Sequence, residues 1–130
     1  MAEFSDALRI LASGLKAQGQ RIRHVSENIS NADTPGYRRK TVAFEEVVSA
    51  GRRTGEVEAG RVMLDRAPLR SIHDPSHPMA GPDGFYDGSN VNLILEIGDA
   101  REAQRSYEAS LKMFEQTRRM SSQLMDILRR

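Results

Sequence analysis

The sequence predicts a mainly α-helical protein with a small β insert. Its two long terminal helices are expected to pair as an antiparallel, coiled-coil-like core, with a small β-rich module between them. Apolar residues recur three and four positions apart near both ends of the 130-residue chain, the spacing of a helix face packed against other helices. All five prolines and seven of the ten glycines lie between residues 31 and 92. Because these residues interrupt helices, long helices are expected only at the two ends.

The first helix is expected over residues 4–29. Its apolar seam is broken only by Gln18. At about 1.5 Å per residue the helix would be roughly 39 Å long, more than a chain of this size covers alone. We therefore expect it to contact both the second helix and other molecules. The seam residues expected to make these contacts are Phe4, Leu8, Leu11, Leu15, Ile22, Val25 and Ile29.

The second helix is expected over residues 93–128, a stretch without proline. Asn92 suits the N-cap, and Glu96 falls in the first turn, where a carboxylate meets the positive end of the helix dipole. The apolar spacing repeats that of the first helix. The residues expected at an assembly interface on this helix are Tyr107, Leu111, Phe114, Leu124 and Leu128.

We therefore expect the chain to divide into three parts. These are a discontinuous helical domain over residues 1–30 and 93–130, a turn and linker over 31–40, and a β-rich outer module over 41–92. Alternation of apolar and polar residues predicts a strand over 42–48. Further short strands are expected near Val57, near Val62 and Leu64, and at Phe85-Tyr86. The module has few large apolar side chains, so we expect the helices or neighbouring subunits to support it.

A local motif follows the first helix, running from Asn28 to Tyr37. Within it Thr34-Pro35-Gly36-Tyr37 suits a type II turn, because proline sets φ at the second position and glycine tolerates positive φ at the third. The helix must end before this turn. The motif residues with an expected role are Asn28, Asn31, Thr34, Pro35, Gly36 and Tyr37.

Composition excludes several classes of function. The net charge of +1, with no strongly polarised segment, argues against a general nucleic-acid binder. No stretch is apolar enough for direct membrane insertion. The first nine residues carry Glu3 and Asp6 and lack the cationic start and apolar run of a cleaved secretory signal. The chain has no cysteine, so neither disulfides nor thiolate metal sites are possible.

No catalytic, cofactor-binding or metal site is expected. His73 and His77 are spaced as two metal ligands could be, but their loop contains two prolines and no third ligand is evident, which favours a solvated loop. Three adjacent bases, Arg38-Arg39-Lys40, are expected to pair with Asp or Glu at a subunit contact. The sequence also contains no glycine-rich phosphate loop and no hydrolase or zinc-protease motif.

The chain resembles the bacterial flagellar axial proteins, which include rod, hook and hook-associated subunits. The resemblance begins with the heptad-rich first helix ending in Asn-Ile-Ser-Asn-Ala-Asp-Thr-Pro-Gly-Tyr. Further matches, which extend it over nearly the whole chain, are similar to the small proximal-rod subunits of this family. These matches are Tyr37-Arg38-Arg39-Lys40, Asp74-Pro75-Ser76-His77-Pro78, Gly84-Phe85-Tyr86 before Asn90-Val91-Asn92, and Ser106-Tyr107-Glu108-Ala109.

The resemblance implies a structural subunit of the basal-body rod, which crosses the periplasm and transmits motor torque to the hook. Its terminal helices would polymerise into a helical tube. Export would use the flagellar type III apparatus, without a cleaved signal peptide. The implied partners are further copies of the chain, other proximal and distal rod subunits, and the basal-body adaptor to the MS ring. Nucleic acid is not an expected partner.

Other interpretations remain open at this point. Within the family, the chain could be a different small rod subunit. Outside it, the two seams would also suit a soluble helical adaptor that binds one partner helix. A small hydrolase or metalloprotein is the least favoured, because it would need a convergent polar site that the sequence does not display.

Overall fold

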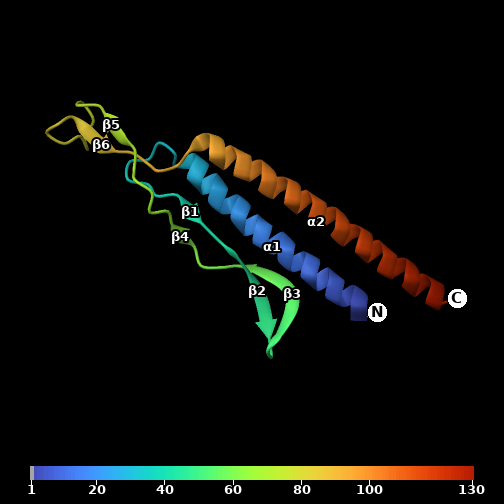
Figure 1. Ribbon diagram of the computed structural model, residues 1–130. Helices are drawn as coiled ribbons and strands as arrows, with labels where there is room; N and C mark the ends of the chain where they lie inside the picture. Colours follow the sequence, from blue (N-terminus) through green and yellow to red (C-terminus); the bar gives the residue numbers. More distant parts are fainter. Residues whose placement is uncertain (1) are drawn as a thin grey trace.

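The computed structural model describes residues 2–130 as two long helices joined by a run of short strands (Figure 1). Helix α1 spans Ala2–Ser30 and helix α2 spans Leu93–Leu128. The helices pack side by side, and the two ends of the chain lie at the same end of the pair, so the helices are antiparallel (Figure 1). The predicted mainly helical architecture is confirmed. No helix in this part of the chain combines the length and apolar character needed to span a membrane.

Helix α2 begins as the sequence predicts. The side chain of Asn92 accepts hydrogen bonds from the backbone N–H groups of Ile94 and Leu95 at 3.2 and 3.4 Å, which confirms the N-cap. The helix has 36 residues against 29 in α1, a difference of about 10 Å in length. Its last turns therefore extend beyond the start of α1 (Figure 1).

The strands form three separate two-stranded antiparallel sheets. The pairs are β1 (Lys40–Thr41) with β4 (Met63–Leu64), β2 (Phe44–Ser49) with β3 (Arg52–Ala59), and β5 (Ser71–His73) with β6 (Phe85–Asp87). Strands were expected at all of these places except β1 and β5. The strand expected over 42–48 begins two residues later, since Val42 lies in the gap between β1 and β2.

The β2–β3 hairpin lies along α1. The backbone N–H of Val57 donates to the Ser13 hydroxyl at 3.1 Å, and a Cβ at Gly55 would lie 3.0 Å from the Ile10 side chain. The β5–β6 hairpin instead lies beyond the end where α1 finishes and α2 begins (Figure 1). No apolar side chain between residues 41 and 90 is buried. The β2–β3 strands are therefore held by α1 and by backbone pairing, and the β5–β6 strands by backbone pairing, rather than by a core of their own.

The apolar core is small. Its buried members are Ala17, Val25, Val91 and Ala103. Most of the predicted seam is only half-buried, namely Phe4, Leu8, Leu11, Leu15, Ile22 and Ile29 in α1 and Tyr107 and Phe114 in α2. Leu111, Leu124 and Leu128 are exposed. A single copy of the chain thus covers its apolar helix faces incompletely.

Candidate assembly interface

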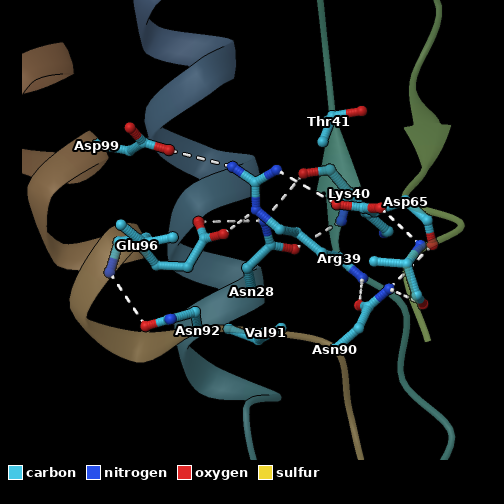
Figure 2. A network of polar contacts seen from close by, with 12 residues as sticks. Asn28, Arg39, Lys40, Thr41, Asp65, Asn90, Val91, Asn92, Glu96 and Asp99 are labelled. Atoms are coloured by element: carbon cyan, nitrogen blue, oxygen red, sulfur yellow. Dashed lines mark hydrogen bonds and ion pairs between the residues drawn. The ribbon is translucent and has the colours of Figure 1, made fainter. Parts of the chain in front are cut away.

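A polar cluster joins the end of α1, the linker and the start of α2 (Figure 2). We call it the junction cluster and define it as Asn28, Tyr37, Arg39, Lys40, Asn90 and Glu96. The side chains of Asn28 and Glu96 are fully buried. Because buried polar groups are costly unless they are hydrogen-bonded, the arrangement of partners decides whether the cluster stabilises the fold.

Both the nitrogen and the oxygen of the Asn28 side-chain amide form hydrogen bonds. Its Nδ2 donates to the backbone carbonyl of Lys40 at 2.9 Å and to the Glu96 carboxylate at 3.4 Å. Its Oδ1 accepts from the Lys40 backbone N–H at 2.9 Å and from the Tyr37 hydroxyl at 2.8 Å. Asn28 therefore holds the chain that returns from the turn against the last turns of α1.

Glu96 is the acidic residue of the junction cluster. Its carboxylate accepts from the Arg39 guanidinium, which also contacts Asp99 at 3.1 Å and Asp65 at 3.7 Å. Burial of the guanidinium opposes its charged form, but the hydrogen bond and charge of Glu96, with the two aspartates, outweigh burial and raise the pKa of Arg39. The pair thus joins two elements that are distant in sequence.

The expectation that Arg38-Arg39-Lys40 pairs with Asp or Glu at a subunit contact is correct in the acidic partners of Arg39 and Lys40, but these partners lie within the chain. All three bases find partners within the chain. Arg39 binds Glu96, Lys40 contacts Glu27 at 2.8 Å, and Arg38 donates to the carbonyl oxygens of Asp65 and Ala67 at 3.2 Å. The turn causes this result, because it brings the tripeptide back between the end of α1 and the first turn of α2.

The turn itself matches the prediction. Gly36 has φ of +74°, and the Tyr37 N–H donates to the Thr34 carbonyl at 3.2 Å, as in a type II turn. Asn31 donates to the Glu27 carbonyl at 2.8 Å and accepts from the Thr34 hydroxyl at 3.1 Å. These bonds satisfy a carbonyl at the end of α1 and connect the helix end to the turn.

The segment that leads into α2 is hydrogen-bonded to the linker and to the turn after α1. Asn90 Oδ1 accepts from the Arg39 N–H at 2.7 Å, and its Nδ2 donates to the Asp65 carbonyl at 2.9 Å (Figure 2). The buried Ser89 hydroxyl donates to the Ala32 carbonyl. These partnerships were not predicted from the sequence. One signal was available, since Glu96 is the only charged residue in the otherwise apolar run 93–97.

The hydrogen bonds of the junction cluster suit it to holding the two helix ends and the linker in one arrangement. Within residues 2–130, no three side chains of the metal-binding types gather in one place. The rings of His77 and Tyr86 instead stack at 3.9 Å between centroids, and His73 meets Phe85 edge-on. The incompletely covered helix faces form the candidate assembly interface, and the cluster holds the two helices together at one end.

Two family models match the chain, one over the N-terminal helix and one over the C-terminal helix. A family model described as "Flagella basal body rod protein" matches residues 8–38, which include most of α1 and the turn. A second, described as "Flagellar basal body rod FlgEFG protein C-terminal", matches residues 83–127 and so includes β6 and nearly all of α2. Four of the six junction-cluster residues lie in these two segments, and Arg39 and Lys40 directly follow the first one.

Curated relatives match over most of their length. The chain is 40% identical to the flagellar basal-body rod protein FlgC of Agrobacterium fabrum, over 99% of this chain and 98% of the relative. It is 30% identical to FlgC of Salmonella typhimurium and 31% identical to FlgC of Escherichia coli O157:H7, each over 85% of this chain and 87% of the relative. The chain therefore belongs to the family of the flagellar basal-body rod protein FlgC.

Proposed function

We propose that this chain is a structural subunit of the flagellar basal-body rod that polymerises through α1 and α2. One observation supports this mode of assembly above the others. The junction cluster holds the helix pair firmly at one end, while the apolar faces of both helices stay partly open along their length. Open apolar faces on a helix pair need partners, and further rod subunits would supply them.

In the assembled rod, α1 and α2 form an antiparallel, coiled-coil-like core facing the inside of a helical tube. Neighbouring subunits complete the half-buried seam of α1 and the exposed seam of α2. Residues 41–92 form the outer module, and the tube transmits motor torque to the hook.

The proposed partners are copies of the chain, other proximal and distal rod subunits, the basal-body adaptor to the MS ring and the flagellar type III export apparatus. The proposed location is the rod where it crosses the periplasm, reached without a cleaved signal peptide. The role is structural and not enzymatic. The names of the relatives support the basal body as the location.

Complementation tests this function. The chain would be expressed in Agrobacterium fabrum lacking its own FlgC, and basal bodies would be purified and analysed by mass spectrometry. We expect the chain in basal bodies and restored motility. A chain that is made and folded but stays in the cytoplasm bound to one partner would support the adaptor alternative and contradict the rod assignment.

A further inference from the structure

Strand β4 forms an outer edge of the insert. Strand β1 contacts α1 and pairs with β4, and β4 lies on the side of β1 that faces away from the helices (Figure 1). At this edge Val62, Met63 and Leu64 are 41%, 55% and 56% exposed. They line a hollow with a volume of about 450 Å³. The chain therefore leaves apolar surface open beside a strand edge.

The backbone of Leu64 faces this open side. Its opposite residue in the β1–β4 register is Lys40, whose N–H and carbonyl both bond with the Asn28 side chain instead of with β4. The next residue, Asp65, donates its N–H to the Arg39 carbonyl at 2.8 Å. Because backbone groups along an antiparallel strand point alternately toward and away from its partner, the Leu64 N–H and carbonyl point away from β1. Such an edge can accept a further strand.

The hollow beside the edge is basic. Three arginines line it, Arg38, Arg61 and Arg66, and no acidic residue does. Arg61 and Arg66 are exposed, and within residues 2–130 neither takes part in an ion pair. The carboxylate of Asp65, which lies between them in sequence, is 3.7 Å from the Arg39 guanidinium and does not line the hollow. The edge therefore favours a partner of negative charge.

We infer that β4 receives an extended acidic segment of a second protein, which adds a strand at its open edge. The main chain of this segment bonds with the N–H and carbonyl of Leu64, and its apolar side chains lie against Val62 and Leu64. Its carboxylates approach Arg61 and Arg66. A free anion would use the arginines but neither the apolar surface nor the backbone groups. The same edge of a second copy is repelled, because it carries the same arginines.

This contact involves neither terminal helix, so it goes beyond the proposed function and does not depend on it. The arginines also give the edge its selectivity. An open apolar edge without charge would pair with any exposed strand, whereas this one attracts acidic strands and repels basic ones. A chain altered at this edge should still enter basal bodies, because its helix faces are unchanged.

A synthetic peptide of alternating glutamate and valine tests the inference, with binding to the full chain measured by calorimetry. We expect binding that weakens as the salt concentration rises. In hydrogen exchange the peptide should protect the amide of Leu64, while the amide of Met63, which already points toward β1, serves as the internal reference.

Two matched peptides separate charge from strand pairing. A peptide with lysine in place of glutamate should not bind, since it meets the arginines with like charge. A copy of the acidic peptide that is N-methylated on alternate amides keeps its charge but loses the donors that pair with a strand edge. It should bind about tenfold more weakly than the unmethylated peptide.

Variants of the chain provide the second measurement. Arg61→Glu with Arg66→Glu should weaken binding of the acidic peptide by about tenfold. The matched control, Arg101→Glu with Arg105→Glu, makes the same change of net charge at two exposed residues of α2. Leu64→Pro should also prevent binding, because it removes the outward N–H. Since that N–H points away from β1, circular dichroism should be unchanged.

Four results would overturn the inference. One is equal binding of the methylated and unmethylated acidic peptides with displacement of both by inorganic polyphosphate, which would make the arginines a site for any polyanion. The second is equal binding of the acidic and lysine peptides. The third is an arginine reversal that changes binding no more than its control does. The last is self-association of the unmodified chain that the acidic peptide reverses, which would make a second copy the occupant of this edge.

Discussion

Arg39 and Glu96 lie 57 residues apart in the chain, and their side chains form an ion pair in which the carboxylate is fully buried. The pair connects the linker after α1 to the first turn of α2. Removal of one member of a buried pair leaves the other charge without compensation, which costs far more than removal of an exposed pair. The orientation of the two helices at the junction therefore depends on this contact.

We expect Arg39→Met to lower the free energy of unfolding by about 3–5 kcal/mol, because Glu96 would remain buried without its charge partner. The measurement is urea unfolding followed by circular dichroism. Arg52→Met is the matched control, since Arg52 is exposed and makes no ion pair in the described chain. Equal stability of the two variants would mean that the pair does not hold the junction.

The contact between Glu27 and Lys40 should make stability depend on pH. The hydrogen bond from Lys40 lowers the pKa of Glu27 below 4.5, and the same bond raises the pKa of Lys40 above 10.5. The folded state then binds fewer protons at Glu27 than the unfolded state does, so the contribution is present above pH 4.5 and is lost as the pH falls through the lowered value. At high pH it is lost as Lys40 deprotonates.

Glu27→Gln tests this dependence. Both side chains are more than a third exposed, so solvent screens the contact and the expected difference from the natural chain is small. It should be greatest near neutral pH and should vanish in acid below the lowered pKa of Glu27. Urea midpoints measured at intervals from acid to neutral pH would follow it. A difference that stays constant over this range would contradict the assignment.

Gly36 sets the direction of the chain leaving α1. Its φ of +74° disfavours a β-branched side chain, while nothing lies within 4 Å of the position of a Cβ. We expect Gly36→Val to cost on the order of 1–3 kcal/mol through the backbone alone, and Gly36→Asn to cost less. In cells the valine variant should be exported but should enter basal bodies poorly. Normal incorporation and motility would show that this turn does not determine the helix-to-module angle.

Seam residues should matter more in the assembly than in the single chain. Leu11→Asp and Leu111→Asp are expected to abolish incorporation into basal bodies, because each subunit would bury a carboxylate at a cost of several kcal/mol. The variants should still reach the secreted fraction. Leu111 is exposed in the single chain, so its variant should remain folded. Incorporation of both variants at the natural level would contradict packing of these seams in the rod.

Two substitutions on the insert serve as controls for the seam variants. Glu58 lies opposite Glu45 across the β2–β3 pair, so Glu58→Lys replaces a like-charge pair by an attractive one and should stabilise the hairpin by about 0.2–1 kcal/mol. Arg61→Glu changes an exposed residue after β3. Both variants should enter basal bodies. Failure of either one would place a rod neighbour on that surface.

Hydrogen exchange should reveal a gradient along the helix pair in the monomer. Amides near Asn28 and over residues 97–104 should be protected, because they flank buried side chains. Amides over residues 3–12 and 113–128 should exchange much faster, since no side chain in either segment is buried. Uniform strong protection in a verified monomer would show that the helices complete each other within one chain, and the need for neighbours would disappear.

The sequence by itself determined the features that depend on neighbouring residues. The range of α2, the Asn92 cap and the type II turn at Gly36 were predicted correctly because apolar spacing, capping and φ preferences act within a few positions. The strands near 44–49 and 85–87 were found for the same reason.

Only the tertiary structure decided which distant groups meet. Arg39 was expected to face another subunit, and Glu96 was interpreted only as a carboxylate near a helix dipole. The fold brings them together because Asn28 and Asn90 hold the linker between the two helix ends. Strands β1 and β5 were missed because Lys40-Thr41 and Ser71-Ile72-His73 lack the neighbouring apolar or aromatic residues that indicated β4 and β6. A buried ion pair depends on distances that close only when the chain folds, and no local pattern specifies them.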